Sequence, residues 1–406
     1  MDGAATPEPR QGPRPLALHL AIASWTWTSS LAVWPMARAG WQPWHPGIQT
    51  RVRAVLEDAE RIAPSVFAEA LNRVALARLG NFLTALDRYR RHPYRRAVPP
   101  VPVIWEEGSS RLFDYGGAGT PVLFVPSLVN RAYVLDLSER RSLMRHLARA
   151  GRHVLLLDWG EPGPTERSFG LTEYVERLAR ALHAASPRAP LDLAGYCMGG
   201  NLALAGALRV PETVRRLVLL ATPWDFHAET SPAATALGRP GSPLLALAEA
   251  MGHLPVDALQ TLFVSLDPLL AARKFSAFGR LPEGSREEED FVAIEDWLND
   301  GVPLTANVAR DCLMGWYGEN LPVRGSWRVA RTTIDPAAVT CPTLVVIPDR
   351  DRIVPPASAR ALAEALPSGK RTVMSPAAGH IGMVVGSRAE TALWQPLATW
   401  LADMRT

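Results

Sequence analysis

Cysteine is scarce in this chain of 406 residues, which contains only Cys197, Cys312 and Cys341. Their wide separation excludes a disulfide framework, and no Cys/His cluster has the spacing of a zinc site. Charge of one sign is lacking too, because 43 basic residues oppose 40 acidic ones and the basic residues are scattered singly. We therefore expect a cytoplasmic protein with reduced thiols, no metal or other cofactor, and no nucleic-acid partner.

A long run without charge stands near the N-terminus. It follows a Pro-rich start, residues 1–15, which we expect to be disordered. The segment 16–37 contains no Asp, Glu, Lys or Arg and is long enough to cross a bilayer. Five tryptophans lie within 16–44, and tryptophan favours the boundary between water and an apolar phase. Three interpretations stay open: a helix packed on its own protein, a helix lying on an apolar surface, or a membrane span.

The composition of the whole chain is typical of a globular protein, with 48% hydrophobic and 20% charged residues. Apolar residues recur at helical spacing over 47–91, which predicts two amphipathic helices, and a Pro-rich linker follows over 92–103. Beyond it, short apolar runs alternate with helical stretches, the pattern of a largely parallel sheet covered by helices. Strands are predicted at Val122–Val125, Val154–Asp158, Leu191–Ala194, Leu217–Ala221, Thr343–Ile347 and Arg371–Met374, and helices at Arg141–Ala150, Leu171–Ala185 and Asn201–Val210.

The alternation stops over about 223–333, where the sequence looks helical with Gly and Pro breaks, and then resumes. This pattern predicts an α/β fold with an inserted helical cap. The expected organisation is an N-terminal extension over 1–95, the first part of the sheet domain over 96–222, the cap over 223–333 and the second part over 334–406. The aromatic residues of the cap either line a substrate site or form its core; they are Phe263, Phe275, Phe278, Phe291, Trp297 and Trp316.

One strand runs directly into a glycine-rich turn around a cysteine. The strand ending near Ala194 is followed by Gly195-x-Cys197-x-Gly199 and then by an Ala-rich helical stretch. This is the pattern of a nucleophile elbow, in which small flanking residues allow a tight strand-to-helix turn. A thiol at a helix N-terminus is favoured as thiolate. The alternative for Cys197 is a buried structural cysteine.

An elbow of this kind predicts an acid after a later strand and a histidine after the last one. Asp351 follows the strand predicted to end at Ile347, and His380 follows the last predicted strand. The rival acid is Asp349, and the alternative for His380 is a histidine on a surface loop.

The elbow also predicts an oxyanion hole of two main-chain donors. One is the N–H of Met198, directly after the nucleophile. The other belongs to the loop after the strand that ends at Val125, and is the amide of either Val129 or Leu128.

Further motifs surround these residues in a fixed order. They are Thr120-Pro-Val-Leu-Phe-Val, Leu128-Val-Asn-Arg-Ala-Tyr, Leu157-Asp-Trp-Gly, Gly195-Tyr-Cys-Met-Gly-Gly, Ala221-Thr-Pro-Trp-Asp-Phe-His227, Trp316-Tyr-Gly-Glu-Asn-Leu, Asp351-Arg-Ile-Val-Pro-Pro and Gly379-His-Ile. At these residues the sequence resembles the polyhydroxyalkanoate synthases, and most of all the short catalytic subunit of the two-subunit, class III type. The likeness covers about residues 100–400.

The resemblance implies a fold, a reaction and partners. It implies an α/β-hydrolase fold in which Cys197 carries the acyl group, His380 is its base and Asp351 is the third member. The implied reaction polymerises 3-hydroxyacyl-CoA with release of CoA, so acyl-CoA is a substrate and the polyester chain a product. Implied partners are a second copy or a second synthase subunit, and a granule or membrane surface contacted through 16–44.

Two other functions compete with polymerisation. A hydrolase, either a thioesterase or an intracellular polyester depolymerase, would use the same triad with water as the acceptor. A non-catalytic granule-surface protein would keep the fold alone, and an intact triad in the right order argues against it.

Overall fold

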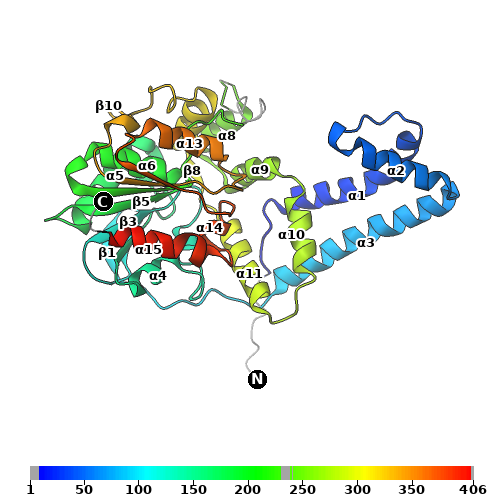
Figure 1. The fold of residues 1–406 in the computed structure, drawn as a ribbon, viewed down its shortest axis with the longest axis horizontal. Coiled ribbons are helices and arrows are strands. Elements are labelled where there is room, and N and C mark those ends of the chain that lie inside the picture. The colour runs from blue at the N-terminus through cyan, green and yellow to red at the C-terminus, as the bar shows by residue number, and fades with distance from the viewer. Residues whose placement is uncertain (1–8, 230–237, 240, 404–406) are drawn as a thin grey trace. The chain divides into compact units, whose positions relative to one another are not determined.

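The computed structural model describes residues 9–229, 238–239 and 241–403. The chain forms two units, one containing Met1–Tyr94 and Gln260–Asn299 and the other Arg95–Leu259 and Asp300–Thr406. We call the first the helical unit and the second the sheet unit (Figure 1).

The sheet unit is built on an eight-stranded sheet with the order β1-β2-β4-β3-β5-β6-β11-β12. The pairings of β4, β3, β5, β6, β11 and β12 with one another are parallel, whereas β1 and β2 pair antiparallel. The strands are β1 (Val103–Glu107), β2 (Ser110–Asp114), β3 (Pro121–Val125), β4 (His153–Asp158), β5 (Leu191–Tyr196), β6 (Val214–Leu220), β11 (Thr343–Val346) and β12 (Arg371–Met374). All six predicted strands are therefore confirmed.

The hairpin of β1 and β2 was not expected from the sequence. Its turn is made by Gly108, whose φ of +58° lies in the left-handed region that favours glycine. Buried and exposed residues are mixed along both strands, so neither forms a continuous apolar run. β1 begins at Val103, the last residue of the expected linker. An edge hairpin of this kind has too little buried surface to leave a strong apolar signal.

Helices cover both faces of this sheet (Figure 1). α5 (Leu171–Ala185) and α6 (Met198–Arg209) pack against each other on one face, while α4 (Leu143–Arg149) and α15 (Gln395–Ala402) lie on the other. α13 (Pro356–Ala365) follows β11. Shorter helical segments are η2 (Ala132–Leu135), η3 (Glu166–Ser168), η4 (Pro211–Thr213), η6 (Pro336–Ala338), α14 (Gly382–Val385) and the π-helix η7 (Glu390–Trp394).

The expected cap over 223–333 is divided between the two units, and part of it lies outside the described residues. Gln260–Asn299 belongs to the helical unit and the remainder to the sheet unit. That remainder also contains strands, because β7 (His253–Leu254) pairs with β8 (Leu304–Thr305) and β9 (Arg328–Val329) pairs with β10 (Thr332–Thr333). Its helices are α8 (Pro243–Met251), α12 (Ala306–Arg310) and the π-helix η5 (Asp311–Gly318), and α9 (Val256–Leu266) crosses the boundary between the units.

The helical unit is organised by an aromatic core. Its helices are α1 (Leu16–Arg38), η1 (Pro46–Ile48), α2 (Gln49–Glu60), α3 (Pro64–Arg91), α10 (Leu270–Phe278) and α11 (Arg286–Asn299), so the two helices expected over 47–91 are confirmed. Phe82 of α3 and Phe275 of α10 are fully buried, with ring centroids 6.2 Å apart. Phe278 is also buried, and its ring stacks on Phe291 at 4.5 Å. Three of the aromatics expected in the cap, Phe275, Phe278 and Phe291, thus belong to or pack on this core.

The expectation that residues 1–15 are disordered is wrong where the structure describes them, and residues 1–8 lie outside the described residues. The Arg10 backbone N–H donates to the Arg90 carbonyl at 3.1 Å, and its guanidinium donates to Asp296 Oδ1 at 2.6 Å. These bonds hold the segment to α3 and α11, a long-range contact that leaves no local sequence pattern.

α1 is long and apolar enough to cross a membrane, as judged by its length and composition. One side of it packs within the helical unit: Trp27 meets Phe82 edge-to-face at 5.9 Å, and Trp34 stacks on Phe67 at 3.9 Å. The other side is exposed, with Trp25 77% accessible. Within its own unit α1 is therefore a half-packed helix.

We expect Phe275→Ala to lower the free energy of unfolding of the helical unit by about 3–5 kcal/mol, because it leaves a cavity in the aromatic core. Denaturant unfolding measures the loss. The matched control is Leu270→Ala on the same helix, where the side chain is 49% exposed and the cost should stay below about 1 kcal/mol. Equal costs for the two variants would show that this core is not where the structure has it.

Candidate active site

The predicted elbow is a tight turn between β5 and α6. β5 ends at Tyr196, α6 begins at Met198, and Cys197 between them has a φ of 56°, in the left-handed region. The turn closes because two glycines lack a side chain. A Cβ on Gly195 would lie 2.4 Å from the Gly199 carbonyl oxygen, and one on Gly199 would lie 2.2 Å from the Val125 carbonyl oxygen. Any larger residue at either position would push apart the strands and the helix.

The main chain around the nucleophile is held by hydrogen bonds. The Cys197 N–H donates to the Leu220 carbonyl at the end of β6 (2.8 Å), and the Cys197 carbonyl accepts from Gly200 N–H (2.9 Å). The Cys197 thiol is free and partly accessible. It lies at the N-terminus of α6, where unpaired N–H groups and the helix dipole favour a negative sulfur.

His380 and Asp351 form a buried pair beside this thiol. His380 Nδ1 and Asp351 Oδ2 are 2.6 Å apart. The other carboxylate oxygen, Oδ1, accepts hydrogen bonds from the backbone N–H groups of Ile353 and Val354, both at 2.9 Å. A hydrogen bond also joins the imidazole to the Cys197 side chain. The structure thus brings the three predicted residues together in the order nucleophile, base, acid.

The rival acid, Asp349, lies outside this arrangement. Its carboxylate is 48% exposed and faces the guanidinium of Arg350 at 3.8 Å, whereas the Asp351 side chain is fully buried. The geometry therefore favours Asp351.

The charges of this site act together on His380. Burial by itself lowers the pKa of the imidazole, because it penalises the charged form. The negative charge on Cys197 and the hydrogen bonds to Asp351 and Cys197 outweigh burial and raise the pKa of His380 to about 10. The site therefore favours the protonated form of the His380 imidazole beside Cys197.

The two predicted oxyanion donors, the N–H groups of Met198 and Val129, differ in their hydrogen bonding. Met198 is the first residue of α6, so its N–H points out of the helix end without an intrahelical partner. The N–H of Val129, in contrast, donates to Ser127 Oγ at 3.2 Å, and the Val129 carbonyl accepts from Val302 N–H at 2.9 Å. The role of either amide stays a prediction.

Sequence reasoning missed Tyr196, which stands in the variable position before the nucleophile. Its hydroxyl donates to the main-chain carbonyl of His380 at 3.3 Å, and the two rings lie 5.1 Å apart. The residue before the nucleophile thus supports the loop of the base. A hydrogen bond between residues 184 positions apart has no signature in a single sequence.

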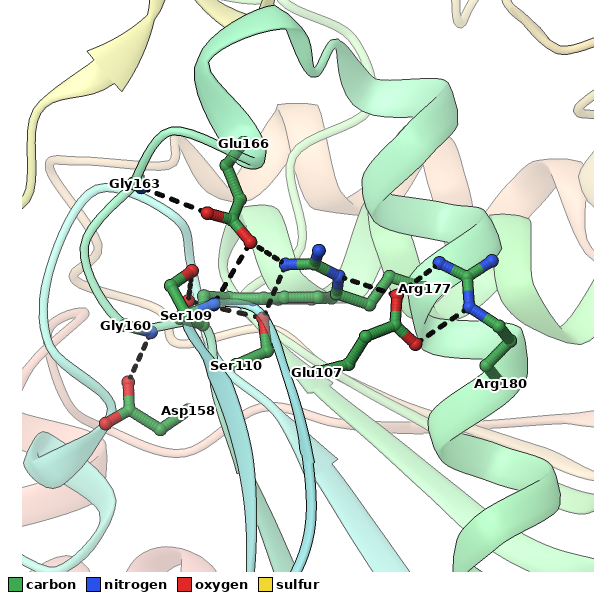
Figure 2. Close-up of polar contacts among 10 residues, drawn as sticks. Glu107, Ser109, Ser110, Asp158, Gly160, Gly163, Glu166, Arg177 and Arg180 are labelled. Atoms are coloured by element: carbon green, nitrogen blue, oxygen red, sulfur yellow. Dashed lines mark hydrogen bonds and ion pairs between the residues drawn. The ribbon is translucent and has the colours of Figure 1, made fainter.

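Sequence reasoning also missed the support of the loop after β3. Trp159 Nε1 donates to the Pro126 carbonyl at 3.0 Å, and the carbonyl of Trp159 accepts from Ser109 Oγ at 2.8 Å. A buried ion pair fixes the loop that carries Trp159 (Figure 2): Glu166 contacts Arg177 at 2.5 Å, and both side chains are 1% exposed. Removing one partner of such a pair costs about 3–5 kcal/mol.

The segment after β6 and the π-helix η5 are tied together within the sheet unit. Asn320 Nδ2 donates to Asp225 Oδ1 at 2.8 Å, and Asn320 Oδ1 accepts from Phe226 N–H at 3.0 Å. The ring of Tyr317 meets that of Phe226 at 5.1 Å. Tyr317 is 38% exposed, so its ring is only partly covered by this contact.

Among the described residues, no group of three or more His, Cys, Asp or Glu side chains could hold a metal ion.

Comparisons with known proteins agree with this geometry. The family model of the alpha/beta hydrolase fold matches residues 120–387. The chain is 31% identical to the poly(3-hydroxyalkanoate) polymerase subunit PhaC of Synechocystis sp. over 70% of this chain and 78% of that protein. It is 30% identical to the subunit of the same name from Haloferax mediterranei, over 75% of this chain but only 64% of that protein. Identity to the one from Allochromatium vinosum is 28%, over 75% of this chain and 89% of that protein.

We expect Asp351→Asn to lower the pKa of His380 from about 10 toward its ordinary value of 6.5, with Cys197 still acting to raise it. The Asp351 carboxylate raises the pKa of His380, whereas burial lowers it. Without the carboxylate charge, less opposes the lowering by burial. An NMR titration of protein labelled with ¹³C-histidine measures the change, with the His380 signal assigned from His380→Gln.

The matched control is Asp349→Asn, which removes an exposed carboxylate from the same loop and should leave the His380 pKa in place. A His380 pKa that responded to Asp349 rather than to Asp351 would transfer the acid role to Asp349.

Proposed function

This chain belongs to the poly(3-hydroxyalkanoate) polymerase family of α/β-hydrolase-fold enzymes, and from that membership we propose that it joins 3-hydroxyacyl units of CoA thioesters into a polyester. The observation that carries the proposal is the Cys197 thiol on its elbow, bonded to a His380 imidazole that is itself held by Asp351. This arrangement suits a thioester substrate, because exchange of one thioester for another is nearly isoenergetic and therefore reversible.

In the first half-reaction the Cys197 thiolate attacks the thioester carbonyl. The carbonyl oxygen becomes an oxyanion, which the Met198 N–H stabilises from the end of α6. The bond to the CoA sulfur then breaks, and the departing thiolate takes the proton that His380 carries. The products are free CoA and an acyl group on Cys197.

In the second half-reaction a hydroxyl group of another 3-hydroxyacyl unit attacks the acyl group on Cys197. His380, now neutral, accepts the hydroxyl proton, an ester bond forms, and the Cys197 thiolate leaves beside the new imidazolium. Both oxygens of Asp351 already accept hydrogen bonds, from His380 and from two backbone N–H groups. We therefore assign the base of both halves to His380 and leave Asp351 the role of holding and charging it.

The competing function is hydrolysis, in which water replaces the hydroxyl in the second half-reaction. The two functions share every step up to the acyl-enzyme, so only the fate of the acyl group separates them. Incubation with 3-hydroxybutyryl-CoA distinguishes them: polymerisation yields polyester in proportion to released CoA, whereas hydrolysis yields free 3-hydroxybutyrate.

We further propose that the exposed side of α1 and the segment that follows it, which contains Trp41, bind the surface of the polyester granule or of a membrane. Trp25 and Trp41 are 77% and 76% exposed. A tryptophan ring partitions into an apolar phase while its indole N–H stays at the polar boundary. Burial of several such rings contributes a few kcal/mol at about 25 cal/mol per Å², enough for reversible attachment.

We expect Cys197→Ala to abolish CoA release, with a loss of at least about 10³-fold, and Cys197→Ser to leave little activity, because a serine hydroxyl is a far weaker nucleophile at its normal pKa. Mass spectrometry of the stalled enzyme should find the acyl adduct on Cys197. Cys341→Ala is the matched control and should retain full activity. An adduct on Cys312 or Cys341 would end the assignment.

We expect the double variant Trp25→Gln, Trp41→Gln to bind polyester granules or anionic vesicles at least about tenfold more weakly, because the two rings together lose more than about 1.4 kcal/mol of apolar burial. Co-sedimentation measures binding, and CoA release from soluble substrate should stay unchanged. Trp27→Gln is the contrasting variant: its ring packs on Phe82, so it should lower thermal stability. Binding that survives loss of both exposed rings would exclude this surface as the anchor.

A further inference from the structure

The oxyanion of the proposed acyl transfer needs a second hydrogen-bond donor besides the Met198 N–H. In this fold that donor comes from the loop that follows β3. Removal of one such donor from an acyl-transfer enzyme costs about 10²–10³-fold in rate, so its identity matters for this chain. The inference that follows rests on the proposed function and names a further residue of the same site.

The backbone of Val129 is already committed. Its N–H donates to Ser127 Oγ at 3.2 Å, and its carbonyl accepts from Val302 N–H at 2.9 Å. A main-chain N–H has a single hydrogen. To bind an oxyanion directly, this amide would first have to give up its bond to Ser127.

The Ser127 hydroxyl, in contrast, has a hydrogen to donate. A hydroxyl offers one donor and two acceptor positions, and the bond from Val129 uses one acceptor position. Among the described residues, Ser127 has no other hydrogen-bond partner. Its side chain is half-buried rather than enclosed, so a ligand can reach the free O–H.

The loop that contains Ser127 lies beside the turn that carries the nucleophile. The Cβ position of Gly199 is 2.5 Å from the Pro126 carbonyl oxygen, so the residue before Ser127 touches the first turn of α6, two positions after Cys197. The Pro126 carbonyl also accepts the bond from Trp159 Nε1. The Pro126 carbonyl thus contacts the start of α6 and is also hydrogen-bonded to Trp159.

We propose that Ser127 is a catalytic residue whose hydroxyl donates the second hydrogen bond to the thioester oxyanion. The Val129 amide acts through it: by donating to Oγ, the amide orients the hydroxyl and polarises it, which strengthens the bond that the O–H makes in turn. No covalent bond to Ser127 forms or breaks. The oxyanion hole of this chain then combines one main-chain donor, Met198 N–H, with one side-chain donor.

Ser127→Ala tests this assignment in a single turnover with 3-hydroxybutyryl-CoA. We expect the rate of Cys197 acylation, followed as CoA release, to fall about 10²-fold or more at saturating substrate, with little change in the substrate concentration at half-saturation. Alkylation of Cys197 by iodoacetamide should keep its wild-type rate, because that displacement forms no oxyanion. Ser127→Thr retains a hydroxyl and should restore most of the acylation rate.

A main-chain donor and the Ser127 hydroxyl predict different results. If the Val129 amide binds the oxyanion itself, Ser127→Ala removes a competing acceptor, and acylation should stay unchanged or become faster. If the Leu128 amide is the donor, acylation should stay unchanged, and either result overturns the proposal. Equal losses of acylation and alkylation would also overturn it, because they would show that Ser127 only maintains the position of the thiol. Should the alanine variant not fold, Ser127→Cys, with a weak S–H donor, provides the same comparison.

This result is separable from the proposed function. A wild-type protein that forms no acyl adduct on Cys197 would refute acyl transfer itself. A wild-type protein that forms the adduct, and a Ser127→Ala variant that forms it equally fast, would refute only the role of Ser127.

Discussion

The active site depends on how closely the start of α6 approaches β3 and β5. That approach is possible because Gly195 and Gly199 have no Cβ, and a Cβ at either position would overlap a main-chain carbonyl oxygen. The same crowding forces Cys197 into a left-handed conformation that a residue other than glycine adopts at a cost of about 1–3 kcal/mol. The sheet sustains this strain because parallel neighbours on both sides of β5 fix the strand before the turn enters it.

The surrounding supports all lead back to this turn. Tyr196, the residue before the nucleophile, donates a hydrogen bond to the main-chain carbonyl of His380. Trp159 donates one to the Pro126 carbonyl and so supports the loop after β3. Behind Trp159 lies the buried pair of Glu166 and Arg177. The Glu166–Arg177 ion pair is almost completely buried and holds a loop in place, whereas Cys197, hydrogen-bonded to His380, is partly accessible.

The parts of this structure that were predictable are those with local patterns. Five of the six predicted strands are short and largely buried, the elbow has its glycines, and chain order identifies His380 and Asp351. What escaped prediction is long-range and polar. The bond from Tyr196 to His380 and the anchoring of Arg10 on Asp296 join residues that are remote in sequence. The sequence also did not predict which segments form the helical unit. The spacing of Phe275 and Phe278 indicates a core, but it does not indicate which helices share that core.

The divided composition of the helical unit has a consequence during synthesis. Its aromatic core combines helices from Met1–Tyr94 with helices from Gln260–Asn299, so the first part cannot complete its core until the second has left the ribosome. At 5–20 residues per second, synthesis from Arg95 to Asn299 takes about 10–40 s. Until Phe275 has been made, the faces of Phe82 and Tyr89 that it later covers lie open. The nascent chain therefore presents an apolar surface that chaperones can bind while the first part of the sheet unit is being made.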